Sequence, residues 1–107
     1  MPVELVRTAV EDIREAVIKV RVAGYDAKSR HNASEVIKTR RDVLTAGHGL
    51  GMNEETSCIA VANFCSAWLA ANRTFDVDPS KKSLRMTLEN SNTALIRECD
   101  ELLAKMH

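Results

Sequence analysis

The sequence predicts an all-α protein, a four-helix bundle in which residues 1–107 form a single domain. Three observations support this fold class. Apolar residues recur at helical spacing towards both ends of the chain, and the middle holds a long run that is apolar almost all round. Helix-start signals and a glycine-rich stretch separate these segments. A helix that is apolar on nearly every side must be covered by others, so we expect the remaining helices to pack around the middle one.

The middle run is the segment around which the other helices are predicted to pack. Between Cys58 and Ala71, only Asn63 and Ser66 are polar. The run is shorter than the roughly 20 apolar residues that cross a bilayer, and it is too long and too rich in alanine for a strand. We therefore expect a largely apolar central helix over about residues 54–72.

This central helix is predicted to have two unlike sides. At 100° per residue, the bulky side chains share the side that should face the chain's own core: Cys58, Val61, Phe64, Cys65, Trp68 and Leu69. The opposite side carries mostly small residues, which let another helix approach closely: Ile59, Asn63, Ser66, Ala67 and Ala70. Asn53 is the expected N-cap, and Glu54 and Glu55 follow in the first turn, where the helix dipole favours negative charge.

The N-terminal segment carries an apolar stripe with heptad-like spacing. Its members are Val3, Val6, Val10, Ile13, Val17 and Val20. Residues 18–22 alternate and are rich in β-branched side chains, which also fits a strand. We expect a helix, because the stripe continues from Val3 without a turn signal.

A second helix is predicted from about Ala33 to Ala46. Asn32 and Glu35 have the spacing of a capping box, in which the first residue caps the helix and the second bonds back to it. Residues 26–31 fit the first helix, the second helix or a loop equally well.

Three alternating glycines around His48 mark the break before the central helix. A glycine loop at a helix N-terminus can also cradle a phosphate. Here Glu54 and Glu55 follow at once and would repel an anion, so we interpret residues 47–52 as an interhelical turn.

The last helix is predicted to run from Pro79 nearly to His107. Asp78 as N-cap and Pro79 at the first helical position form its start signal. Residues 89–93 are polar throughout and poor in helix formers, so a kink there is the alternative to one continuous helix. We favour continuity, because the inward spacing resumes in phase after them: Leu84, Leu88, Leu95, Cys99, Leu102 and Met106.

Composition sets bounds on location and partners. The chain has 15 basic and 15 acidic residues, so no overall field attracts a polyanion, and its few aromatic residues are not interleaved with basic ones. We therefore expect no nucleic-acid partner. Three cysteines in helical contexts fit buried thiols in a reducing compartment, and no secretion signal or membrane span is visible. The expected location is cytoplasmic.

No metal or cofactor site is predicted. Cys58 and Cys65 lack the short paired spacing of zinc ligands. The run Glu54-Glu55 partly resembles the magnesium motif of all-α nucleotide pyrophosphohydrolases, but Cys58 stands where that motif has its third glutamate, and Glu101 stands where it has an aspartate.

Basic residues suggest an anion site instead. Lys81 and Lys82 lie in the predicted first turn of the last helix, where the dipole disfavours cations. Lysines at that position are what an anion-binding helix end requires. The candidate ligand residues, including two arginines of the second helix, are Lys81, Lys82, Ser80, Ser83, Arg40 and Arg41.

The predicted function is that of a small non-enzymatic helical protein of adaptor or regulatory type. We expect it to act through self-association and protein–protein contact, because its apolar helix surface exceeds what three partner helices cover. A homodimer or higher oligomer would use the small side of the central helix as interface: Ile59, Asn63, Ala67 and Ala70.

Two alternatives remain. One is a binding module for a small anionic ligand at the basic helix N-terminus. The other is an all-α enzyme similar to the chorismate mutases, which grip a dicarboxylate with cations from several helices. Arg14, Lys38, Arg40 and Arg41 allow such a cage, although the chain has none of the glutamine common in that site.

Overall fold

Four α-helices make up the computed structural model, which describes the backbone of residues 3–46 and 52–106 and the side chains of residues 3–46 and 57–106. The helices are α1 (Val3–Val22), α2 (Ala27–Thr45), α3 (Met52–Val77) and α4 (Lys82–Lys105). The described residues contain no strand. The predicted all-α four-helix bundle is therefore confirmed. The glycine loop with His48 lies outside the described residues.

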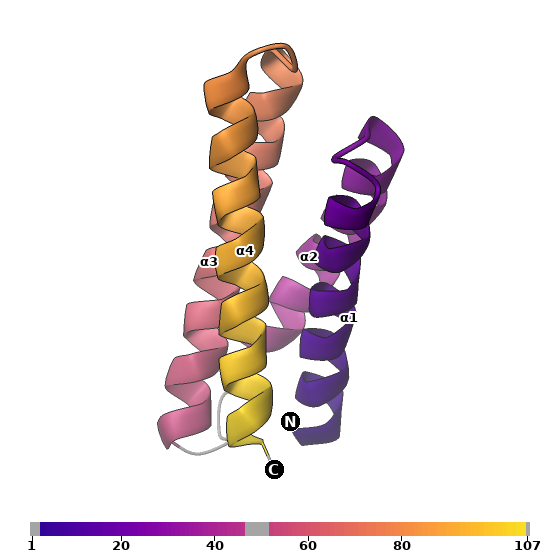
Figure 1. Ribbon diagram of the computed structural model, residues 1–107. Coiled ribbons are helices and arrows are strands. Elements are labelled where there is room, and N and C mark those ends of the chain that lie inside the picture. Colours follow the sequence, from indigo (N-terminus) through magenta and orange to yellow (C-terminus); the bar gives the residue numbers. More distant parts are fainter. Residues whose placement is uncertain (1–2, 47–51, 107) are drawn as a thin grey trace.

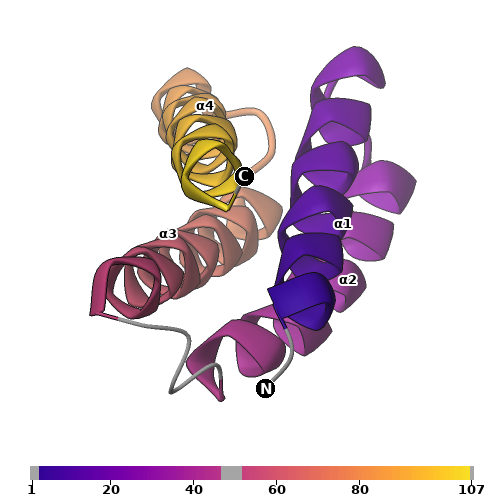
Figure 2. The same cartoon turned by 90° about the horizontal axis from the view of Figure 1, so that it is seen from below.

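The helices alternate in direction, so that α1 begins and α4 ends at the same end of the bundle (Figure 1). Each helix contacts the next one along the chain, and α4 returns to pack against α1. The end-on view shows the α3–α4 pair beside the α1–α2 pair (Figure 2). The bundle measures 44 × 20 × 19 Å. Its four seams are therefore α1–α2, α2–α3, α3–α4 and α1–α4.

Helix α1 buries the apolar stripe that the sequence predicts. Five of its members are fully inaccessible to solvent: Val6, Val10, Ile13, Val17 and Val20. Val3, at the start of the helix, remains exposed. The strand alternative for residues 18–22 is wrong, since a helix continues through them.

The connection between α1 and α2 is a Schellman turn. The backbone N–H of Gly24 donates to the carbonyl of Arg21 (3.1 Å), and that of Tyr25 donates to the carbonyl of Val20 (2.9 Å). Gly24 adopts φ 70°, which glycine tolerates without a steric penalty. Tyr25 also has a positive φ, of 62°, while its ring is buried together with Val20. The chain thus reverses direction within a few residues.

Helix α2 begins earlier than the capping box predicts. Asp26 is the N-cap, and its carboxylate accepts the backbone N–H of Ser29 at 2.8 Å. Residues 27–31 are helical, and the prediction of Asn32 as N-cap is wrong. The Schellman turn explains the difference, because it leaves Asp26 directly at the point where the new helix can begin.

Helix α3 is longer than predicted at both ends. It begins before Asn53, so that residue lies inside the helix, and it continues five residues past the expected end at position 72. Phe75 drives this extension, because its ring is buried and keeps the last turns against the core. The bulky side packs inward as expected: Cys58, Val61, Cys65, Trp68 and Leu69 are buried and Phe64 is half-buried. Among the described residues, no helix is long and apolar enough to cross a membrane.

Helix α4 starts later than predicted, and the expected cap at Asp78 is wrong. The Asp78 carboxylate instead accepts the hydroxyl (2.6 Å) and the backbone N–H (3.3 Å) of Ser80, and the N–H of Lys81 donates to the Asp78 carbonyl (3.1 Å). These bonds close a β-turn with Pro79 at its second position, which proline favours. Lys81 is the N-cap of α4. The helix then runs without interruption through residues 89–93, as we expected.

Candidate functional site

Three of the four seams of the bundle are bridged by an ion pair between helices. Arg14 of α1 pairs with Asp100 of α4 at 2.5 Å. Arg40 of α2 pairs with Asp12 of α1 at 3.1 Å. The seam between α2 and α3 is bridged by the ion pair of Arg30 with Asp76. These charged side chains make the three seams polar at their surfaces.

The α3–α4 seam differs, because no ion pair joins these two helices in the part of the chain whose side chains are described. It holds a groove of about 400 Å³ whose lining residues all lack charge: Ala67, Ala70, Ala71, Thr74, Leu84, Thr87 and Ser91. Most of these side chains are small. Along these residues the seam presents a hollowed, uncharged surface to solvent, which we call the α3–α4 groove. Nearer the other end of the same seam, the Lys105 ammonium of α4 donates to the Ser57 hydroxyl of α3 at 2.9 Å.

The predicted interface residues lie beside or within this groove. Ala67 and Ala70 line it and are exposed. Asn63 is exposed on the same side of α3, and Ile59 leaves 46% of its surface in contact with solvent. The small side of the central helix therefore stays uncovered in the single chain, and the three partner helices do not shield it.

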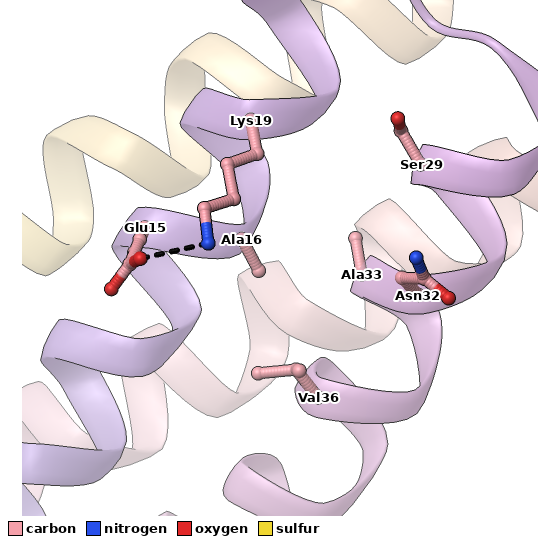
Figure 3. Close-up of a pocket in the computed structure, with 7 residues that line it drawn as sticks. All are labelled: Glu15, Ala16, Lys19, Ser29, Asn32, Ala33 and Val36. Atoms are coloured by element: carbon pink, nitrogen blue, oxygen red, sulfur yellow. Dashed lines mark ion pairs between the residues drawn. The ribbon is translucent and has the colours of Figure 1, made fainter. Parts of the chain in front are cut away.

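The groove between α1 and α2 shows how different the other seams are. It measures about 300 Å³, and Ala16, Ala33 and Val36 form its apolar part. The Glu15–Lys19 ion pair, at 2.9 Å, stands on one side, as Figure 3 shows. Lys19 also lowers the pKa of the Glu15 carboxyl, through a hydrogen bond and its charge. A solvated ion pair at the rim is typical of an ordinary bundle surface.

The residues proposed for an anion site are not gathered in one place. Lys81 and Lys82 are exposed at the start of α4, and no side chain caps that helix. Arg40 pairs with Asp12. Arg41 reaches Ser66 at 3.4 Å. The α2 arginines therefore serve other seams.

Of the two neighbouring serines, Ser80 uses its hydroxyl for a bond within the chain, and Ser83 contributes its backbone carbonyl to another. The Ser80 hydroxyl donates to Asp78, and the Ser83 carbonyl accepts the Thr87 hydroxyl. The anion site stays a prediction for Lys81 and Lys82 without support from the arginines.

The cations considered for an enzyme cage are dispersed as well. Arg14 lies on the α1–α4 seam, whereas Arg40 lies on the α1–α2 seam. Lys38 is exposed on α2, 3.9 Å from Glu35 of the same helix. The structure does not bring these groups around a common cavity.

Sequence reasoning missed a buried arginine. Arg30, which no motif or apolar pattern in the sequence singles out, is only 5% exposed. Its guanidinium donates to the Tyr25 carbonyl (2.8 Å) and to the Asn72 side-chain oxygen (2.9 Å), pairs with Asp76 and lies 4.6 Å from the centre of the Phe75 ring. Every direction of the side chain is thus occupied by the protein itself, so the cluster holds α2 to α3 and offers no site for a ligand.

A second buried polar group crosses the core. The Trp68 indole N–H donates to the Asn92 side-chain oxygen (2.9 Å), and the Asn92 amide donates to the Val17 carbonyl (3.0 Å). Asn92 has no exposed surface. One amide therefore links α3, α4 and α1, which explains why a polar residue interrupts the inward face of α4.

The three cysteines are buried. Burial raises the pKa of the Cys65 thiol to about 12 and also raises that of the Cys99 thiol. A nucleophilic cysteine needs the opposite environment, one that stabilises the thiolate. The described residues include no group of three or more side chains that could hold a metal ion.

Comparison with known proteins adds no further constraint. No family model, curated protein or solved structure matches this chain. The functional argument therefore depends on the chain's own surfaces, of which the α3–α4 groove is the most distinctive.

Proposed function

We propose that this chain is a small self-associating interaction protein, of adaptor or regulatory type, that uses the α3–α4 groove and the adjoining side of α3 as its contact surface. The observation that carries the proposal is the absence of charged side chains from the lining of this groove. From Cys58 to Asn72, α3 has no charged residue, although its outer side faces solvent.

Depletion of charge at the centre of a surface is the feature that separates interfaces from ordinary protein surface. A solvent-facing helix side normally carries charged residues, as the other seams of this bundle do. Ile59 adds an exposed apolar side chain to the same surface. The uncharged groove and the exposed Ile59 each lower the solubility of a monomer and favour contact with another protein.

The dimensions of the bundle suit such a contact. One long side measures 44 × 20 Å, a footprint on the order of 900 Å². A standard protein–protein interface buries about 800 Å² on each partner. The α3–α4 side is therefore large enough for a stable association without rearrangement of the helices.

A single charge placed in the groove tests the proposal. We expect Ala70→Glu to give a monomer at concentrations where the wild-type protein is a dimer, because the carboxylate would have to be buried without a partner. Thr39→Glu, an exposed substitution on α2, is the matched control and should leave the dimer intact. The measurement is the molar mass by light scattering after size-exclusion chromatography. A dimer that persists in Ala70→Glu, or a wild-type protein that is monomeric throughout, contradicts the proposal.

A further inference from the structure

We infer that the occupant of the α3–α4 groove is a second copy of this chain, with the two α3 helices antiparallel and related by a two-fold axis at Ala67. The inference depends on the proposed self-association and adds its geometry. Three features of the chain select this arrangement: the position of Ile59, the position of Asn63 and the distribution of charge at the ends of α3.

Ile59 and the far end of the groove are nearly symmetric about Ala67. Ile59 lies eight residues before Ala67, and Thr74 lies seven residues after it. A two-fold axis at Ala67 therefore brings the partner's Ile59 to the level of residue 75, one residue past Thr74. There the groove is lined by Leu84, so an exposed apolar side chain meets an apolar recess. The same contact forms twice, once in each copy.

Asn63 meets a polar part of the groove in the same register. It lies four residues before Ala67, so the partner's Asn63 falls at the level of Ala71, in the groove that Thr87 also lines. The Thr87 hydroxyl already donates to the Ser83 carbonyl at 3.0 Å, and its oxygen is thus left to accept the amide N–H of the partner's Asn63. One polar residue in an otherwise apolar seam fixes the register of paired helices.

Charges at the two ends of α3 agree with an antiparallel pair. The first turn of α3 contains Glu54 and Glu55, twelve to thirteen residues before Ala67. The two-fold axis places the backbone of this turn of the partner beyond the end of α3, near the connection that leads to Lys81 and Lys82. Segments of opposite charge in the sequence are thereby brought to the same end of the pair, which orients the partners. A parallel pair would set the lysines of the two copies side by side.

The residues at the axis are small enough for a close crossing. Ala67 and Ala70 are exposed and sit where the two α3 helices would meet. Helices with small side chains at the contact approach to about 8 Å between their axes. The pair of lysines that suggested an anion site then lies at the same end of the dimer as the first turn of the partner's α3.

Cysteine cross-linking tests the register. A residue on a two-fold axis meets its own copy, so Ala67→Cys should give a covalent dimer on mild oxidation, seen on a non-reducing gel. Thr39→Cys on α2 is the matched control and should stay monomeric on that gel. The native cysteines should not interfere, because all three are buried, and wild-type protein is oxidised in parallel to verify this.

A second pair of variants separates antiparallel from parallel packing. In the antiparallel dimer, the two copies of residue 59 lie about 24 Å apart along the helix axis. Ile59→Cys alone should therefore not cross-link, whereas a mixture of Ile59→Cys with Thr74→Cys should give a mixed dimer.

Each outcome bears on a different claim. Self-linking of Ile59→Cys, or failure of Ala67→Cys to link in a protein whose mass is that of a dimer, overturns this geometry and leaves the proposed function standing. A wild-type protein that is monomeric by mass overturns both.

Discussion

A single amide, that of Asn92, organises the polar contacts inside this core. Its oxygen accepts from the Trp68 indole, and its nitrogen donates to the Val17 carbonyl. A buried polar group without a partner costs about 1–3 kcal/mol, so each member of this chain of hydrogen bonds depends on the others. The arrangement specifies how α4 is rotated against α1 and α3, which apolar contacts alone would leave less defined.

A double-mutant cycle can measure the coupling free energy between Trp68 and Asn92. Asn92→Leu should lower the free energy of unfolding by about 1–3 kcal/mol, because the Trp68 N–H loses its acceptor. The double variant Trp68→Phe with Asn92→Leu should lose less than the sum of the single losses, by at least about 0.5 kcal/mol. Urea unfolding followed by circular dichroism, at one fixed protein concentration, gives the three values. Additive losses would show that the two side chains do not act together.

Residue types predict which side chains are apolar, but they do not predict which polar ones are buried. Arg30 lies among Lys28, Ser29 and His31, a context that favours an exposed cation. Its burial depends on Asn72 and Asp76, which are more than 40 residues away in the sequence. No local pattern carries that information, because it arises from the packing of α2 against α3.

At the scale of elements, the helices themselves could be predicted, and the starts of α2, α3 and α4 could not. The α1 stripe and the apolar run of α3 repeat over several turns, so each rests on many residues. The prediction of a helix end depends on only one or two residues. Asp78-Pro79 fits a helix start and a β-turn equally well. In the structure it forms a β-turn, because the buried Phe75 extends α3 almost to Asp78 and the chain must reverse there.

The cap of α2 depends on a charge, which makes its contribution sensitive to pH. The hydroxyl of Ser29, and then its backbone N–H, hold the pKa of the Asp26 carboxyl below its ordinary value. A pKa that is lowered in the folded state means that the carboxylate stabilises the fold above the ordinary pKa. That stabilisation is lost as the pH falls through the folded value.

Asp26→Asn keeps a capping side chain and removes only the charge. We expect the variant to be less stable than the wild-type protein at about pH 6, and the difference to become smaller at about pH 2.5, because it closes as the pH falls through the lowered pKa of Asp26. Urea unfolding at the two pH values measures the difference, and Asp42→Asn on the exposed side of α2 is the control. A gap that stays constant with pH would mean that the charge of Asp26 is not what stabilises the helix start.

For the whole molecule, the sequence predicted that the chain has more apolar helix surface than it can cover. The structure leaves the α3–α4 groove and Ile59 uncovered on one long side, and it also exposes apolar side chains elsewhere, among them Leu5 and Val22 of α1. What the sequence did not predict is the contrast with the other three seams, because ion pairs such as Arg14–Asp100 and Arg40–Asp12 join residues far apart in the chain. The α3–α4 groove is recognised as a candidate site only by contrast with the ion pairs on the other three seams, and those ion pairs depend on the fold.

The predicted anion site and the predicted interface then become parts of one surface. Lys81 and Lys82 stand at the end of the same seam that Ala67 and Ala70 line. In an antiparallel dimer the lysines serve as a charged rim around an uncharged centre, which is the usual composition of an interface. A separate small ligand is not needed to account for them.

Small-angle X-ray scattering of the wild-type protein tests the self-association most directly, because it gives mass and shape in one experiment. The account predicts a mass of twice 11.9 kDa and a radius of gyration clearly above the 13.6 Å of the single chain. It also predicts a longest dimension well below twice the 44 Å length of one bundle, since the copies lie side by side and not end to end. A particle of 11.9 kDa with a radius of gyration close to 13.6 Å would contradict it.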